Sequence, residues 1–355
     1  MKLLHASDFH LDSSFRRLDG EKAALRRREL RDIPARLAAL AVEEQVDLVL
    51  LSGDLFDGER VYPETVQALT EGLAAIPCPV FIAPGNHDHC RPGSPYLTAC
   101  WPDNVHIFTR RDMESVELPA LRCTVHGCAF TEAHREDDPL AGFTVPDDGN
   151  IHLLCVHGEV GKEGRYGPID PRSIALSGAR YAALGHVHVC SGLQREGNTF
   201  WAYPGCPEGR GFDEEGQKGV LMLTLEEGKT DCRFHPLCRR QYRIERVDVR
   251  LFPDILPQSD PDLVRFILTG ESDTAPNLDR LTELALPHCF HVELRDETTL
   301  PQQLWDRAGE ETLTGLFLQE MRRLMDGASP EEEADLLLAA RFGLAALEGR
   351  EDIRL

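Results

Sequence analysis

The chain has 355 residues, 42% of them hydrophobic and 28% charged, which is enough to build a main domain and a smaller second one around buried cores. Its 38 Lys and Arg against 60 Asp and Glu give a formal net charge of −22, a balance that argues against broad, non-specific binding to a polyanion. The eleven cysteines are scattered and never spaced C-x-x-C, so neither a disulfide framework nor a thiolate zinc site is indicated, and we interpret them as small buried residues in a reducing compartment.

The amino-terminal part of the chain alternates short apolar runs with helical patterns. No apolar run reaches ~18 residues, and Asp8 and His10 interrupt the amino terminus before a signal-peptide core could form, so we expect no membrane span, no secretion signal and a cytoplasmic location. Strands are expected over 2–7, 47–52 and 79–83, and helices over 20–45 and 62–76. Pro34 should either kink the first helix or begin a second one. This rhythm predicts a mainly parallel sheet covered by helices.

Beyond Asn104 the pattern changes to short strand-like segments separated by turn residues. Such segments are found at 104–108, 114–118, 122–128, 151–156, 181–184, 198–203 and 219–225. The stretch 137–150 is rich in Asp, Pro and Gly and is typical of a surface loop. The first three of these segments predict a second sheet, the strands 151–156 and 181–184 lead back to the candidate site, and 198–203 and 219–225 form a further pair.

The residues after Cys238 contain no cluster that we interpret as catalytic. A small α+β unit is expected over 242–300, with strands near 243–249, 263–269 and 289–294 and a helix near 278–285. The last segment is helical, and its apolar stripe consists of Leu313, Leu316, Phe317, Met321, Leu324 and Met325. Ser329-Pro330-Glu331-Glu332 opens the next helix with an N-cap, a first-turn proline and a capping-box acid. The predicted domains are therefore 1–238, 239–300 and 301–355.

Five apolar runs are each followed by residues that commonly bind metal ions. In parallel sheets, binding sites lie at this carboxyl end of the strands. These residues are Asp8, His10, Asp54, Asn86, His157, His186 and His188. Any one of the fourteen histidines is more often a core or surface residue, but five strand ends that carry such residues are hard to assign to chance. Oxygen and nitrogen ligands without sulfur suit two divalent ions of the Mn²⁺, Fe²⁺ or Zn²⁺ type better than one structural zinc.

We assign roles within this set by chemistry. Asp54 follows the most hydrophobic strand, and we expect it to bridge the two ions. Asp8, His10 and His188 can complete the ligand set of one ion. Asn86, His157 and His186 can complete that of the other. His87 follows a ligand and precedes Asp88, so we expect that carboxylate to orient it and keep it protonated as a proton donor to the leaving oxygen.

The segment 16–36 is locally positive, with eight basic and four acidic residues on a strongly negative chain. In one interpretation the segment is a solvated helix face without a binding role. In the other it is a patch that contacts substrate phosphates beside the site. The candidate substrate-binding residues are Arg16, Arg17, Arg26 and Arg27.

Taken in order, the motifs resemble those of the calcineurin-like metallophosphoesterases. They are Asp8-Phe9-His10, Gly53-Asp54-Leu55-Phe56-Asp57, Gly85-Asn86-His87-Asp88, Val156-His157-Gly158 and Gly185-His186-Val187-His188. The helical insert after Asp12, the run Asn104-Val105-His106-Ile107-Phe108, and the run from Tyr203 to Arg210 with Phe212, Glu214 and Lys218-Gly219 are similar to the SbcD-type DNA repair exonucleases, particularly their shorter YhaO-like branch. The resemblance covers residues 1–235 well and 242–300 loosely.

The resemblance implies an α/β fold: a sandwich of two mixed β-sheets flanked by helices, with a small α+β cap domain and C-terminal helices. It also implies a DNA exonuclease, with endonuclease activity as an addition, two divalent ions with Mn²⁺ favoured, a homodimer, and an SbcC-like coiled-coil ATPase as partner. The charge of −22 fits poorly with unaided DNA binding. Two alternatives stay open, namely a phosphodiesterase acting on a small nucleotide or cyclic nucleotide, and a non-catalytic scaffold for an ATPase.

Overall fold

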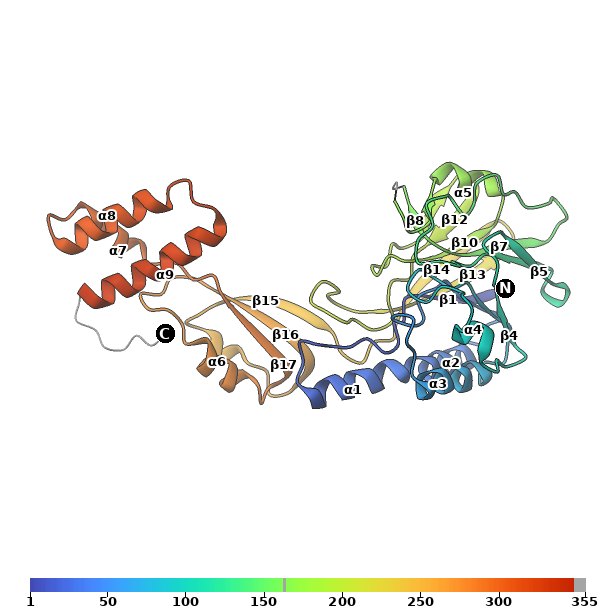
Figure 1. Ribbon diagram of the computed structural model, residues 1–355, viewed down its shortest axis with the longest axis horizontal. Coiled ribbons are helices and arrows are strands. Elements are labelled where there is room, and N and C mark those ends of the chain that lie inside the picture. Colours follow the sequence, from blue (N-terminus) through green and yellow to red (C-terminus); the bar gives the residue numbers. More distant parts are fainter. Residues whose placement is uncertain (162–163, 348–355) are drawn as a thin grey trace. The chain divides into compact units, whose positions relative to one another are not determined.

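The computed structural model describes residues 1–161 and 164–347. The chain divides into two compact units, Met1–Gln241 and Tyr242–Leu355 (Figure 1). None of the helices in the described part of the chain combines the length and the apolar character needed to cross a bilayer.

The first sheet of the amino-terminal unit has the order β14-β13-β1-β2-β3-β4. Its strands are β1 (Lys2–Ala6), β2 (Leu48–Leu51), β3 (Val80–Ile82), β4 (Val105–Ile107), β13 (Gly219–Glu226) and β14 (Lys229–Pro236). The first four run parallel, and β13 and β14 add antiparallel strands beside β1. The helices of this region are α1 (Gly20–Arg31), α2 (Ile33–Glu43), α3 (Pro63–Ala74) and α4 (Pro95–Thr98). Pro34 lies in the first turn of α2, where its missing N–H costs nothing, so it begins a second helix.

The second sheet has the order β11-β12-β10-β7-β6-β5. Its strands are β5 (Glu114–Leu118), β6 (Cys123–Gly127), β7 (Ile151–His157), β10 (Tyr181–Gly185), β11 (Gln194–Glu196) and β12 (Thr199–Ala202). The four inner strands are parallel, and the two edge strands are antiparallel. One apolar cluster joins Leu48, Leu50 and Phe81 of the first sheet to Val125 and Leu153 of the second, so the two sheets pack face to face.

The mainly parallel sheet and the second sheet that the sequence predicts are both confirmed, but the segment 104–108, which was expected in the second sheet, forms β4 at the edge of the first. Several short or edge elements were missed, because each lacks a continuous apolar run. The edge strand β14 alternates polar and half-buried positions, the edge strand β11 has three residues, and α4 and α5 (Pro171–Ser177) are too short for helical periodicity. A short pair of parallel strands, β8 (Glu159–Val160) and β9 (Pro168–Ile169), was missed for the same reason.

The second unit begins with a parallel sheet of three strands, β15 (Tyr242–Asp248), β16 (Asp260–Thr269) and β17 (Cys289–Asp296), and α6 (Leu278–Ala285) packs on β17. These are the strands and the helix that the sequence predicts. Three helices follow, α7 (Gln302–Asp306), α8 (Leu313–Met325) and α9 (Pro330–Leu347). The predicted capping box is also confirmed, because Ser329 N donates to Glu332 Oε2 at 2.9 Å and Glu332 N donates back to Ser329 Oγ at 3.4 Å.

The predicted stripe of α8 does not face one way. Leu318 and Met321 are buried against α9 in a small core, and Gly343 of α9 leaves the room that the Phe317 ring fills. Three other leucines of α8, Leu313, Leu316 and Leu324, are exposed, with exposed fractions of 70%, 62% and 43%. We call these three residues the outward leucines.

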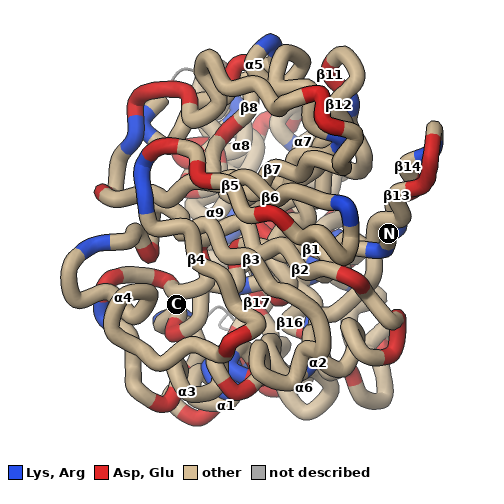
Figure 2. The backbone as a smooth tube through the Cα atoms, turned by 90° about the vertical axis from the view of Figure 1, so that its right-hand side faces the viewer, with Lys and Arg blue, Asp and Glu red and all other residues tan. Residues whose placement is uncertain are grey.

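Acidic residues are spread over many loops instead of forming one block, and the turn between β13 and β14 is one such place (Figure 2). The net charge of −22 is therefore distributed over the surface, as expected for a solvated acidic protein.

Candidate metal centre

Every predicted ligand lies at or just after the carboxyl end of a strand. Asp8 and His10 follow β1, Asp54 follows β2, Asn86 follows β3, His157 ends β7, and His186 and His188 follow β10. Four of these residues have positive backbone φ values, with 56° at Asp8, 45° at His10, 52° at Asp54 and 107° at His186. Such conformations cost about 1–3 kcal/mol each in residues other than glycine and persist where the surrounding structure imposes them. Their concentration here is typical of a functional site.

Two glycines leave the space that these side chains occupy. A Cβ on Gly85 would press against the Asp54 carboxylate and lie 2.7 Å from the Asp54 backbone nitrogen. A Cβ on Gly53, whose φ is +92°, would lie 2.9 Å from Cγ of the His157 ring. The glycines of both motifs are therefore required by close approach.

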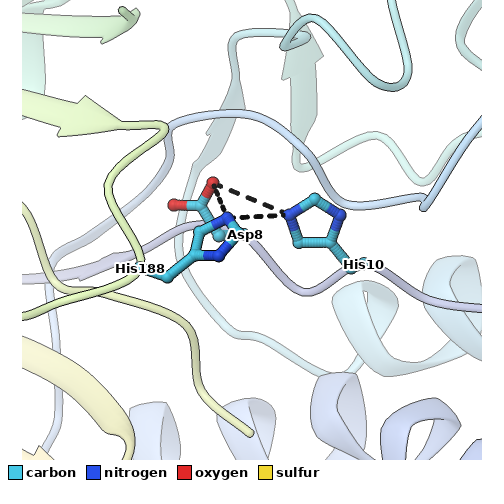
Figure 3. A group of neighbouring side chains, drawn as sticks. All are labelled: Asp8, His10 and His188. Carbon is cyan, nitrogen blue, oxygen red and sulfur yellow. Dashed lines mark hydrogen bonds and ion pairs between the residues drawn. The ribbon is translucent and has the colours of Figure 1, made fainter. Parts of the chain in front are cut away.

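The first cluster consists of Asp8, His10 and His188, whose side chains point toward one another (Figure 3). The two Nε2 atoms of the histidines lie 3.1 Å apart, and Asp8 Oδ1 lies 4.0 Å from His10 Nε2 and 3.7 Å from His188 Nε2. Asp8 and His10 come from the loop after β1 of the first sheet, and His188 comes from the loop after β10 of the second. The cluster therefore forms only where the two sheets pack together.

The second cluster brings Asn86 and His186 to His157. His157 Nε2 lies 2.9 Å from Asn86 Oδ1, and His186 Nδ1 lies 3.2 Å from the same oxygen. His157 Nδ1 donates to the Ser52 carbonyl at 2.9 Å, which fixes its tautomer and leaves a lone pair on Nε2.

Asp54 lies between the two clusters. A single oxygen, Oδ2, is 3.8 Å from His10 Nε2 and 3.4 Å from His157 Nε2, while Oδ1 accepts a hydrogen bond from His87 N at 2.9 Å. Burial raises the pKa of the Asp54 carboxyl well above its ordinary value, and the carboxylates of Asp88 and Asp8 raise it further. A carboxylate placed in this way needs nearby positive charge in order to stay ionised.

The donor set fits divalent cations. His10 Nδ1 faces Asp57 Oδ1 at 3.0 Å and His188 Nδ1 faces Glu214 Oε1 at 2.8 Å, so both Nδ1 atoms donate and both Nε2 atoms carry lone pairs. Two lone pairs then face each other at 3.1 Å, a repulsive contact that a shared cation removes, since two nitrogens bound at about 2.0–2.1 Å to one ion lie within about 4 Å. Burial, followed by Arg210, lowers the pKa of His10 well below its ordinary value, which keeps the ring neutral as a ligand must be.

A second layer of residues holds these ligands, and the sequence motifs did not predict its role. Arg210 donates to Asp57 Oδ1 at 3.1 Å and to Glu214 Oε1 at 2.8 Å, so one guanidinium links the carboxylates behind His10 and His188. The run from Tyr203 to Arg210 with Glu214 stood out in the sequence, but nothing in its spacing indicated which ligands it would support.

His87 is exposed, and one of its ring nitrogens lies within 4.8 Å of ligand atoms of His10 and Asp54, a third group of residues that could hold an ion. Its ring is edge-on to that of His10, with centroids 4.8 Å apart, and its Nδ1 is 3.3 Å from the Asp57 carbonyl. The expectation that Asp88 orients this ring is not met. Asp88 accepts from Leu55 N, Gly85 N and Tyr96 Oη, and within the described residues no hydrogen bond joins Asp88 to His87. Asp88 is buried because it ties the loops after β2 and β3 together.

The arginines of the positive segment differ in how far they are buried. Arg26 is fully buried, where it bonds Glu29 at 2.5 Å and Glu208 at 3.0 Å, so the expectation that it contacts substrate is wrong. A buried charge of this kind must be paired, and one of its two partners, Glu208, lies 182 residues away in the chain. Arg27 is half-buried and donates to the Ser14 carbonyl. The exposed arginines of the segment are Arg16, Arg17 and Arg28.

Comparison with known proteins points to one family. The family model described as calcineurin-like phosphoesterase matches residues 1–190, a span that contains all seven predicted ligands. A Bacillus subtilis (strain 168) protein described as the uncharacterized metallophosphoesterase YhaO is 28% identical over 302 residues, which is 78% of this chain and 72% of the relative. The crystal structure of TT1561 of Thermus thermophilus aligns with 66% of this chain and 98% of its own at 12% identity, with a TM-score of 0.41 that is too low to bear on function.

Proposed function

The chain belongs to the calcineurin-like phosphoesterase family of metal-dependent phosphoester hydrolases, and from this premise we propose that it is a two-metal exonuclease that cleaves the phosphodiester bonds of DNA. The observation that supports a two-metal site is the position of Asp54 Oδ2 between His10 Nε2 and His157 Nε2, each of which belongs to a separate cluster. Mn²⁺ is the proposed metal, with Fe²⁺ or Zn²⁺ as alternatives that the same nitrogen and oxygen donors accept.

Each residue of the centre has a part in this proposal. Asp8, His10 and His188 would hold one ion, and Asn86, His157 and His186 would hold the other, with Asp54 between the two sets. Bound divalent ions supply Lewis acidity and lower the pKa of a bound water toward neutrality. His87 is exposed beside the clusters, where it can give a proton to the leaving oxygen, a contribution of about 10²–10⁴-fold in rate.

Two features favour DNA over a small nucleotide as the substrate. The exposed arginines occupy the helical insert after Asp12, the segment that resembles SbcD-type nucleases, and they can contact a phosphate backbone. The chain also carries a second folded unit, Tyr242–Leu355, which an enzyme of small phosphodiesters does not need. DNA binding by an acidic protein should then be local and strongly salt-dependent.

The outward leucines support the partner that we propose, an SbcC-like coiled-coil ATPase. Three large apolar side chains on one side of a surface helix suit packing into an apolar groove or against another helix. The proposal also includes a homodimer, as the resemblance to SbcD-type nucleases implies.

The test uses the metal-stripped full-length protein, reloaded with Mn²⁺, and four substrates: end-labelled linear duplex, linear single strands, closed circular single strands and bis-p-nitrophenyl phosphate. Progressive shortening of linear DNA, abolished by Asp54→Asn, is the expected result. Cutting of circles would add endonuclease activity. Hydrolysis of the chromogenic diester and of cyclic nucleotides without DNA cleavage would favour the small-nucleotide alternative, and two bound ions with no hydrolysis would favour the scaffold.

A further inference from the structure

The two ion clusters are held by different kinds of support. His157 Nδ1 donates to the Ser52 carbonyl directly after β2, and Asn86 follows β3, so the second cluster is held by backbone at the ends of two buried strands. The first cluster is held by hydrogen bonds to other side chains. His10 donates to Asp57 at 3.0 Å and His188 donates to Glu214 at 2.8 Å.

Arg210 joins those two side-chain supports. Its Nη1 donates to Asp57 Oδ1 at 3.1 Å and its Nη2 donates to Glu214 Oε1 at 2.8 Å, and its side chain is only 19% exposed. The backbone of Arg210 also donates to Glu214 Oε2 at 2.8 Å, so residues 210–214 form a closed turn around that carboxylate. A planar guanidinium with a rigid fork of donors is the group that can hold two carboxylates at a fixed separation.

The turn itself is fixed to the rest of the amino-terminal unit. Glu208, two residues before Arg210, accepts from the buried Arg26 of α1 and from the backbone nitrogens of Arg239 and Arg240. Lys218 Nζ, on the other side of the turn, lies 3.3 Å from the His188 carbonyl. Arg210 is therefore presented to Asp57 and Glu214 by a loop that is anchored at both ends.

We propose that Arg210 is a positioning residue that clamps Asp57 and Glu214 and thereby sets the affinity of the Asp8, His10 and His188 cluster alone for its ion. This inference rests on the metal centre of the proposed function and not on its DNA substrate. Of the two ions, the one in this cluster dissociates more readily, because its histidines are held by other side chains and not by the backbone at strand ends.

Arg210 could act on ion affinity as a nearby positive charge or as a clamp, and these two roles predict opposite changes in the ion affinity of Arg210 variants. As a nearby positive charge, Arg210 repels a cation, so Arg210→Gln should tighten ion binding and Arg210→Lys should leave it unchanged. As a clamp, Arg210 fixes two ligands, so both variants should weaken the binding of one ion by about 10–100-fold, the usual cost of losing an outer partner of a metal-bound histidine. The two variants thus separate the mechanisms within one titration.

The experiment is a Mn²⁺ titration of metal-stripped full-length protein by calorimetry, with elemental analysis after desalting. Wild type should bind two equivalents of Mn²⁺, and Arg210→Lys, Arg210→Gln and Glu214→Gln should each retain one. The dissociation constant of the retained ion should stay within about threefold of the tighter wild-type value, a change much smaller than the 10–100-fold weakening expected at the affected cluster. Glu215→Gln, which removes the same charge from the exposed neighbouring position, is the matched control and should retain two.

Tighter or unchanged binding in Arg210→Gln would overturn the clamp, as would weakening of both steps together. Loss of folding is separated from loss of clamping by thermal unfolding of the ion-free proteins. A variant that unfolds earlier is replaced by Asp57→Asn, which breaks the same link from its other end. Because every readout is ion binding, the outcome does not depend on whether the enzyme cleaves DNA.

Discussion

Replacement of Asp54 by Asn tests the core of the site, since it keeps the size of the side chain and removes its charge. Oδ2 of Asp54 lies 3.8 Å from His10 Nε2 and 3.4 Å from His157 Nε2, so one oxygen serves both clusters. Two divalent ions about 3.5–4 Å apart repel each other by about 4 kcal/mol even at the dielectric constant of water. That repulsion corresponds to about three orders of magnitude in the binding of a second ion, and a bridging carboxylate screens it.

We therefore expect Asp54→Asn to lose both ions on desalting, because the first ion loses a ligand and the second also loses its screening. The measurement is elemental analysis of Mn per chain, together with the paramagnetic spectrum of bound Mn²⁺. Asp103→Asn, at an exposed position of the same unit, is the control for a lost charge and should keep two equivalents. A folded Asp54→Asn protein that still holds two equivalents would refute the bridging role.

Four further predictions concern other residues. His87→Ala should keep both ions and DNA affinity while kcat falls by about 10²–10⁴-fold, and turnover within about threefold of wild type would contradict a proton donor. Reversing the exposed arginines to Glu should weaken DNA binding and flatten its salt dependence without changing hydrolysis of bis-p-nitrophenyl phosphate. Arg26→Glu, by contrast, should destabilise folding by about 3–5 kcal/mol in urea titrations, because it places a third carboxylate between Glu29 and Glu208. Changing the outward leucines to Gln should leave the unfolding temperature unchanged and abolish co-purification of the ATPase, and retained co-purification would exclude that docking surface.

The metal ligands could be predicted from local patterns in the sequence. A buried strand is visible as an apolar run such as Leu48–Leu51, and Asp54 follows it within a few residues. Because the inner strands of each sheet are parallel, the residues that follow strands of the same sheet meet at one edge. The packing of the two sheets then decided that His188 of the second sheet meets Asp8 and His10 of the first. Apolar periodicity likewise predicts the order of elements in the second unit.

The contacts behind the ligands were decided by the tertiary structure. Asp88 follows His87 in the chain, yet the fold turns its carboxylate toward the amides of Leu55 and Phe56 and toward Tyr96. Adjacent residues of a tight turn point in different directions, so closeness in sequence did not establish that the two side chains meet.

Burial of charge was likewise invisible in the sequence. Arg26 and Arg28 are both basic residues of α1, but only Arg26 meets Glu208, which arrives from a loop 182 residues later. Arg210 reaches Asp57 across 153 residues in the same way. A charged side chain is buried only where the fold supplies its counter-ion, since an unpaired charge in the interior costs too much free energy. Which residues can bind metal is therefore visible along the chain, whereas the charges that surround and hold them depend on contacts between distant segments of the fold.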